Sequence, residues 1–245
     1  MKITHYFALL VCLLVVPQAW SAQTLRYSAV SSWNMPYARF DGEQVVEGIM
    51  YDLAMAVEAQ LQIPVTFVVF SRKRVDAAAT NGDVDLRCYI TPQWTELPEQ
   101  YVWSGKLFEV SDVIFGTDAT AAPASIDEIP FGSVISTVLG YGYPTLDTSF
   151  ASGRLKREDA VDQEKVNLKL TAARTPYGVS EVVALNWYER LTPNHRHAPW
   201  RLVVSKQDFQ CGIPKKGNIP AAKILKAFDA MKKANQFEDI LRKYR

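Results

Sequence analysis

Aromatic side chains occur at positions where an α/β protein would hold a small ligand. Trp33 and Tyr37 lie in a loop after a first apolar strand, and Tyr89 and Trp94 flank the turn at Thr91. Aromatic faces bind apolar groups and cations, and the ligands of open α/β sheets sit beyond the carboxyl ends of strands. We therefore expect these five residues to line a ligand pocket. The alternative is that the rings pack in the core or fill the surface between two lobes.

Three arginines are candidate partners for a ligand carboxylate. Arg87 lies in a predicted strand that is covered on both faces, where an unpaired charge is costly. It can bind a ligand or form an internal ion pair with Asp83 or Asp85, and the ion pair is the preferred interpretation. Arg72 and Arg74 begin a predicted helix, where cations are less favourable. Arg74 can point toward the pocket, although a solvated helix face explains both residues more simply.

A Gly- and Tyr-rich stretch from Ser136 to Tyr143 precedes a predicted short helix. Helix N-termini bind anions, and Gly140 permits close approach of the backbone to a ligand. Tyr141 and Tyr143 can stack on the same ligand. The stretch is therefore a second candidate ligand-binding segment, and an ordinary Gly-rich turn explains it equally well.

Metal and catalytic signatures are weak. His195 and His197 lie in a Pro-bounded loop without Cys or carboxylate neighbours, which is typical of an exposed loop and not of a metal site. The sequence has no G-x-S-x-G or S-x-x-K motif and no Cys-His catalytic pattern. We expect no metal, no cofactor and no enzymatic activity.

Residues 1–22 are typical of a secretory signal peptide. Lys2 precedes an apolar run at 6–16, and small residues permit cleavage after Ser21 or Ala22. The apolar run is too short for a membrane span, so we expect a soluble protein exported to the periplasm.

Charge and cysteine content limit the partners of the exported chain. Loss of Lys2 from the 27 basic residues leaves 26, which balance the 26 acidic residues and give no reason to expect nucleic acid or an anionic membrane as partner.

Cys88 and Cys211 are the cysteines outside the signal peptide. They can form a disulfide in an oxidising compartment or remain as two buried thiols, and the sequence leaves both open.

Strands and helices alternate in two successive units, which predicts an α/β fold. We expect strands at 24–30, 65–70, 84–90, 110–116, 132–135, 155–161 and 179–185, and helices at 48–61, 72–80, 145–151, 162–173, 220–233 and near the C-terminus. Crossings through 117–125 and 200–214 would join two lobes around a cleft. The expected first lobe is 23–113 plus 206–245, and the second is 114–205.

Several short motifs follow one another in the order found in one family. The chain resembles the amino-acid-binding family of periplasmic solute-binding proteins (extracellular solute-binding protein family 3). The motifs that carry the resemblance are Pro36-Tyr37, E-G-I-M-Y-D-L-A at 47–54, N-G-D-V-D at 81–85, T-P-Q-W at 91–94, Y-V-W-S at 101–104 and G-I-P-K-K-G at 212–217.

This resemblance implies a two-lobed periplasmic-binding-protein-like fold, with a mostly parallel sheet flanked by helices in each lobe and two hinge crossings between the lobes. It implies a monomer that closes on one small ligand and passes it to an ABC permease in the inner membrane. It also implies that the stretch from Ser136 offers backbone N–H groups to an anionic group of the ligand. The chain departs from the family at Trp94, where the T-x-x-R motif has an Arg that clamps the ligand carboxylate.

Two other functions fit the same resemblance. Some relatives are dehydratases, and Glu47 or Asp52 would then act as general acid or base. The protein can also be a ligand-binding accessory of a membrane sensor, since a fold does not fix a function.

Overall fold

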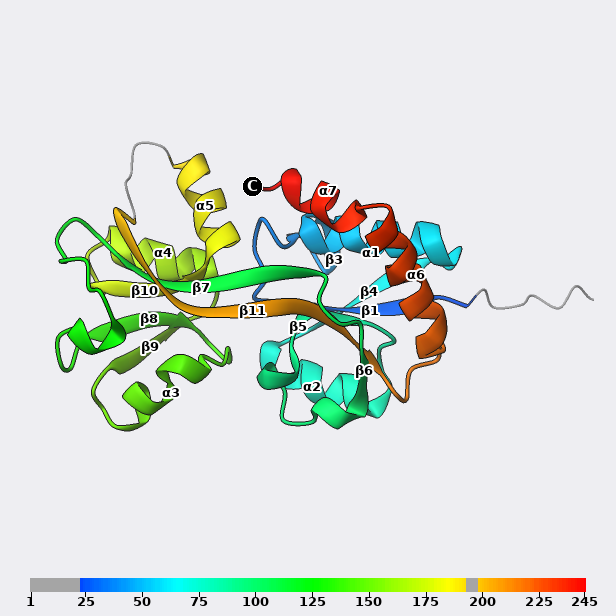
Figure 1. Ribbon diagram of the computed structural model, residues 1–245, viewed down its shortest axis with the longest axis horizontal. Coiled ribbons are helices and arrows are strands. Elements are labelled where there is room, and N and C mark those ends of the chain that lie inside the picture. Colours follow the sequence, from blue (N-terminus) through cyan, green and yellow to red (C-terminus); the bar gives the residue numbers. More distant parts are fainter. Residues whose placement is uncertain (1–22, 193–197) are drawn as a thin grey trace, which may run out of the picture.

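Two groups of helices and strands lie side by side and share two long strands, β7 and β11, that run through both (Figure 1). The computed structural model describes residues 23–192 and 198–245. We call the two groups the first and second lobes. The predicted signal peptide, His195 and His197 lie outside the described residues. Within the described ranges, no helix is long and apolar enough to cross a membrane.

The first lobe contains the chain up to the shared strands and both C-terminal helices. Its elements are β1 (Leu25–Val30), β2 (Arg39–Asp41), β3 (Gln44–Glu47), α1 (Ile49–Leu61), β4 (Val65–Phe70), α2 (Arg72–Asn81), β5 (Arg87–Ile90), β6 (Tyr101–Trp103), α6 (Ala221–Lys233) and α7 (Gln236–Arg242). Short 3-10 turns, η1 (Pro92–Trp94) and η2 (Pro98–Gln100), follow β5. Strands β1 and β4 pair in parallel, and an isolated parallel bridge joins Tyr27 of β1 to Leu86 beside β5.

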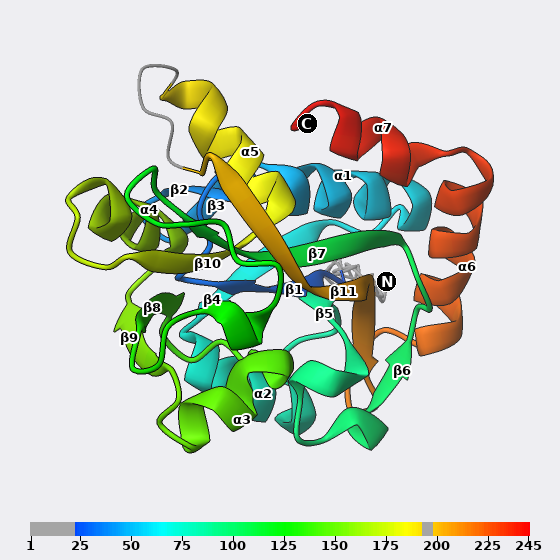
Figure 2. The ribbon, with the colours of Figure 1, turned by 60° about the vertical axis from the view of Figure 1, so that its left-hand side comes forward.

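The second lobe is formed by the chain between the shared strands. Its elements are η3 (Ile126–Glu128), β8 (Val134–Val138), α3 (Pro144–Ala151), β9 (Lys156–Ala160), α4 (Gln163–Thr171), β10 (Tyr177–Glu181) and α5 (Val182–Leu191). Strands β10, β8 and β9 are parallel neighbours, and β7 (Phe108–Gly116) is antiparallel to both β10 and β11 (Trp200–Pro214). Figure 2 shows β7 and β11 crossing from one lobe into the other. The predicted lobe boundaries at 113 and 205 fall inside these strands and stay a prediction.

Helix α1 shows how the sequence produces the local structure. Its apolar residues recur at helical spacing, and those from Ile49 to Leu61 on one face are buried. Gly48, just before it, has φ +117°, and a Cβ there would lie 2.5 Å from the backbone oxygen of Tyr37. Only glycine therefore fits between the helix start and the loop that carries Tyr37.

Two predicted boundaries are wrong. The apolar stretch at 179–185 is not one strand, because β10 ends at Glu181 and α5 begins at Val182. The Glu181 carboxylate accepts hydrogen bonds from the backbone N–H groups of Val183 (2.8 Å) and Ala184 (3.3 Å), which caps the new helix. The predicted loop from Ser136 begins later, since β8 continues to Val138.

Of the two alternatives left open for the cysteines, the structure has the disulfide. Cys88 of β5 and Cys211 of β11 are directly opposite each other on antiparallel strands, with Cα atoms 3.9 Å apart. Both residues are buried. The bond fixes the end of β5, where Tyr89 begins the site described next.

Candidate functional site

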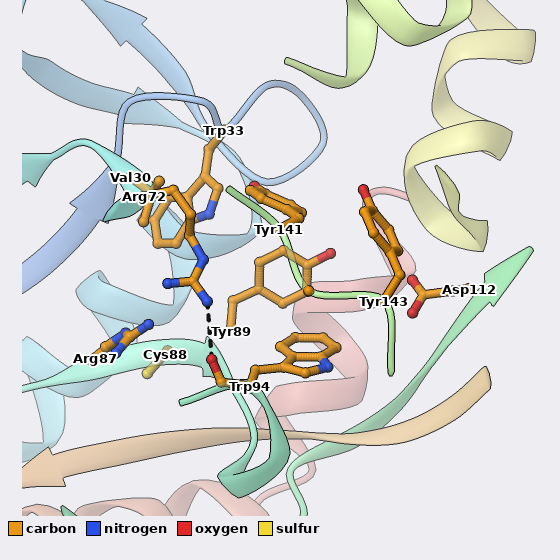
Figure 3. A pocket seen from close by; sticks show the side chains of 11 residues that line it. Val30, Trp33, Arg72, Arg87, Cys88, Tyr89, Trp94, Asp112, Tyr141 and Tyr143 are labelled. Carbon is orange, nitrogen blue, oxygen red and sulfur yellow. Dashed lines mark hydrogen bonds between the residues drawn. The ribbon is translucent and has the colours of Figure 1, made fainter. Parts of the chain in front are cut away.

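A small cavity lies where the ends of β1 and β5 face the loop after β8 (Figure 3). Its volume is about 50 Å³. It is lined by Val30, Trp33, Arg72, Arg87, Cys88, Tyr89, Trp94, Asp112, Tyr141, Gly142 and Tyr143. Residues from both lobes contribute, so the cavity lies between them. A ligand as large as an amino acid requires the lobes or the rings to separate.

Tyr89 lies at the centre of an aromatic cluster. Its ring stacks on Tyr37 at 4.2 Å and on Phe209 at 5.4 Å, meets Trp94 edge-on at 5.9 Å, and lies 6.4 Å from Trp33. Its backbone is left-handed, with φ +59°. The structure therefore brings together the four rings singled out in the sequence. Their role in ligand binding stays a prediction.

Glu181 is an acidic group of the site that was not predicted from the sequence. It is only 6% exposed and lines a second cavity of about 50 Å³ with Tyr37, Tyr89 and Asp112. Burial raises its pKa to about 7, although the hydrogen bond from Tyr37 partly offsets the effect. The sequence offers one clue, because Glu181 ends an apolar strand at the edge where ligands bind.

Asp112 is the second acidic group. It lies on β7 and lines both cavities, and its Oδ2 accepts a 2.7 Å hydrogen bond from the Ser205 hydroxyl. Burial raises its pKa above the usual value. Across the described residues, neither Asp112 nor Glu181 forms an ion pair.

The arginines of the site share one acid. Arg72 and Arg87 both form ion pairs with Asp76 of α2, and Arg87 also donates a 2.8 Å hydrogen bond to the Tyr101 hydroxyl. Burial opposes ionisation of Asp76, but Arg87 and Arg72 outweigh it and hold its pKa below the usual value. An internal ion pair for Arg87 was expected, although its partner is Asp76 and not Asp83 or Asp85.

Two other charged residues considered in the sequence do not line the cavities. Asp85 pairs with Arg26 at 2.9 Å. Arg74 is exposed and does not line either cavity, whereas Arg72 does. Successive residues of a helix turn through about 100°, so a shift of one or two residues moves a guanidinium from the cavity to solvent.

The loop after β8 is held by Arg157 of β9. Its Nη2 donates to the backbone oxygens of Val138 (3.1 Å) and Tyr141 (3.0 Å), and its guanidinium lies 5.3 Å from the ring of Tyr143. Gly140, at φ +78°, lies against the side chain of Arg72 in the other lobe. Of the residues predicted in this segment, Tyr141 and Tyr143 therefore reach the cavity.

Ser136 and Thr91 are placed differently from the rings. Ser136 is fully buried inside β8, outside the cavity lining, and its hydroxyl has no hydrogen-bond partner within the described chain. Thr91 caps η1, where its hydroxyl accepts from the Gln93 N–H at 3.3 Å. Thr91 thereby positions Trp94, whose indole N–H is buried without a partner among the residues that the structure describes.

The described residues contain no cluster of three or more side chains suited to a metal ion.

Glu47, a sequence-based candidate for an acid or base, is half exposed and pairs with Arg39. Asp52 binds Lys243 and Tyr244 at the C-terminal helix. Neither residue lines the two cavities.

Comparison with known proteins identifies the fold. No family model and no curated protein matches the sequence. Solved structures match nearly the whole chain, which shows the periplasmic-binding-protein-like α/β fold predicted from the sequence. The neighbours include amino-acid-binding proteins, in agreement with the resemblance to that family.

Three of these solved structures illustrate the range of proteins that share the fold. An ancestral arginine-binding protein bound to arginine is 20% identical, with a TM-score of 0.73, covering 90% of this chain and 97% of its own. A histidine kinase sensor domain with similarity to periplasmic binding proteins is 17% identical, with a TM-score of 0.73 and coverages of 91% and 96%. An ancestral amino-acid-binding protein, a precursor of cyclohexadienyl dehydratase, is 17% identical, with a TM-score of 0.71 and coverages of 90% and 94%.

Proposed function

We propose that this chain is an exported solute-binding protein, which captures a small polar or amino-acid-like ligand between its lobes and delivers it to an ABC permease in the inner membrane. The observation that carries the proposal is a cavity lined by aromatic and ionisable side chains from both lobes. The disulfide of Cys88 and Cys211 agrees with an oxidising compartment.

Closure explains how such a site works. A ligand that contacts Tyr89 of the first lobe and Tyr143 of the second makes both sets of contacts only when the lobes are together. This difference in contacts is the free energy that drives closure. The closed form would then be the one that a permease recognises.

The test uses the mature chain after unfolding and refolding, which removes carried-over solute. A thermal-shift screen of amino acids, amines and small carboxylates should find a ligand, and one present at ~100 times its dissociation constant should add ~2.7 kcal/mol of stability. Small-angle scattering should then show a smaller radius of gyration. Trp94→Ala should weaken the binding, with the exposed Glu47→Gln as the matched control. Absence of a thermal shift with every compound in the screen would contradict the proposal.

An enzymatic function is the second candidate, and Glu181 now favours it more than Glu47 or Asp52 do. A buried carboxyl group with a pKa of about 7 suits a general acid or base near neutral pH. Incubation of each bound compound with the protein, followed by NMR, distinguishes the two functions. Unchanged compounds support binding alone.

A further inference from the structure

A third and larger cavity lies beside the two cavities of the candidate site. Its volume is about 520 Å³, against about 50 Å³ for each of the other two. Small-molecule sites in proteins typically measure about 300–1,000 Å³. We call the larger cavity the outer groove and the other two the inner cavities. The outer groove lies between the loop before β2 in the first lobe and helices α4 and α5 in the second.

The outer groove adjoins the second inner cavity. Both are lined by Trp33, Asn34, Met35, Gln163 and Ala184. Trp33 also lines the first inner cavity, so its ring stands between the outer groove and the ionisable groups of the site. A ligand that is held in the inner cavities can therefore extend past this ring into the outer groove.

The charged side chains of the outer groove already have partners within the chain. Arg39 pairs with Glu47 at 2.8 Å, and a carboxylate oxygen of Glu164 lies 3.6 Å from Nζ of Lys165. Asp162 accepts the N–H of Lys165 at 2.8 Å, which caps α4. The part of a ligand that lies in this groove therefore needs no charge of its own.

Apolar side chains from both lobes form the walls of the outer groove. Met35, Ala38 and Phe40 contribute from the first lobe, and Trp187 and Leu191 contribute from α5. Leu191 is 63% exposed, so it offers an apolar surface that the chain itself does not cover. Removal of such surface from water is favourable, and an aromatic or branched apolar group of a ligand would cover it.

One polar group of the outer groove has unused hydrogen-bonding capacity. Asn167 of α4 lines the groove and is only 2% exposed. Its Oδ1 has a long 3.5 Å contact with Nε2 of Gln163, and its amide nitrogen donates no hydrogen bond to another described residue. An asparagine amide carries two donors, and a carbonyl oxygen is a suitable acceptor for them. A neutral amide in the ligand would supply that oxygen.

We propose that the ligand of this protein is longer than a single amino acid and that its extension lies in the outer groove. The extension is an uncharged aromatic or branched apolar group, joined through an amide whose oxygen accepts a hydrogen bond from Asn167. This inference rests on the proposed solute-binding function and narrows it to amide conjugates. A free amino acid would leave the exposed face of Leu191 and the donors of Asn167 without a ligand partner.

Matched pairs of compounds test the inference directly. Titration calorimetry of the refolded mature chain would compare N-acetylglycine with N-benzoylglycine, Nε-acetyllysine with Nε-benzoyllysine, and glycinamide with its N-benzyl derivative. Both compounds of each pair contain the amide, and only the second contains an aromatic ring. The three pairs attach the ring at the α-nitrogen, the side chain and the carboxyl carbon. At least one aromatic compound should bind tenfold or more tightly than its counterpart.

Three variants locate the extension. Leu191→Glu places a charge in the apolar wall at an exposed position, so it should weaken binding of the aromatic compound tenfold or more and leave its counterpart unchanged. Leu168→Glu, at a 43% exposed position of α4 outside the groove, is the matched control. Asn167→Leu removes the amide donors and should weaken both compounds of the pair severalfold. Circular dichroism confirms folding, and Leu191→Glu decides alone if Asn167→Leu does not fold.

The outcomes separate the two proposals. Binding of amino acids or short amides with no gain from the aromatic ring overturns the inference and leaves solute binding in place. A gain from the ring that persists in Leu191→Glu does the same, and unchanged affinities in folded Asn167→Leu overturn the role of Asn167. Absence of binding by every compound, here and in the thermal-shift screen, overturns both proposals.

Discussion

The hydroxyl of Tyr37 donates a 2.5 Å hydrogen bond to Oε2 of Glu181, and this bond joins the two lobes across the cleft. Tyr37 lies in the loop before β2 and Glu181 ends β10, 144 residues away along the chain. The tyrosine also stacks on Tyr89. One side chain therefore connects the acidic side of the site to its aromatic centre.

Removal of that hydroxyl should favour the open form. Tyr37→Phe keeps the stacking on Tyr89 and deletes only the bond to Glu181, so we expect a loss of about 1–2 kcal/mol in the free energy of unfolding. Small-angle scattering without ligand should show a larger radius of gyration. Tyr51→Phe, a tyrosine of α1 outside both cavities, serves as the control. A variant as compact and as stable as the native protein would show that this bond does not hold the lobes together.

The raised pKa of Glu181 predicts a pH dependence of stability. The groups around this carboxyl are Tyr37, Tyr89 and Asp112, none of which is cationic. The folded state holds the proton up to about pH 7, whereas in the unfolded chain the carboxyl loses it near the ordinary glutamate pKa of 4.5. Stability is therefore highest below the unfolded pKa and falls as the pH rises toward 7, by roughly 3 kcal/mol for this group.

Urea unfolding between about pH 4.5 and pH 8 measures this slope. Glu181→Gln cannot titrate, so its stability should fall less over that interval than the stability of the native chain. Identical slopes for the two proteins would refute the assignment to Glu181. Other carboxylates titrate in both chains and cancel in the difference.

Trp94 should decide whether a carboxylate is accepted. Trp94→Arg places a guanidinium at the position where the T-x-x-R motif of the amino-acid binders has one, so tyrosine should gain affinity relative to tyramine, which lacks only the α-carboxylate. Competition binding with these two compounds measures the shift. Trp94→Gln, which adds no charge, is the control, and equal effects of the two substitutions would argue against this role.

The disulfide should contribute strongly to stability. Cys88 and Cys211 are 123 residues apart in sequence, so the bond constrains a long segment of the unfolded chain, and its removal should cost about 2–4 kcal/mol. The double variant Cys88→Ser, Cys211→Ser should also bind ligand more weakly, because Tyr89 follows Cys88 directly. Chemical denaturation with and without a reductant measures the first effect. Native stability in the double variant would contradict it.

Local sequence patterns predicted those helices that depend on a single short stretch of the chain. The apolar period of α1 is confirmed, and the helix predicted at 162–173 forms as α4, whose N-cap Asp162 accepts from the N–H of Lys165 at 2.8 Å. The aromatic cluster was also predictable in part, because Trp33 follows β1, Tyr89 lies near the end of β5, and these two strands lie side by side. Their neighbouring positions come from the parallel order of β1 and β5.

Features that depend on contacts between distant segments were missed. The apolar stretch around Glu181 is buried both as strand and as helix, so periodicity alone does not locate the change from one to the other. The partner of Arg87 is Asp76 on α2, and no pattern in the sequence of β5 points to that helix. This long-range pairing of charges follows from the packing of α2 against β1 and β4, which places Asp76 within reach of Arg87 and which no local pattern determines.

The strand β11 pairs with β7 over residues 200–209, from Trp200 opposite Gly116 to Phe209 opposite Phe108, with a register shift between Val203 and Ser205. The lobes are thus joined by two hydrogen-bonded strands, and a closure that keeps these hydrogen bonds would have to twist both strands. A register shift increases the local twist of a strand, so such a closure would concentrate its twist there. If a ligand closes the lobes, part of its binding free energy would go into twisting these strands, and their stiffness would help to set how tightly the ligand is held.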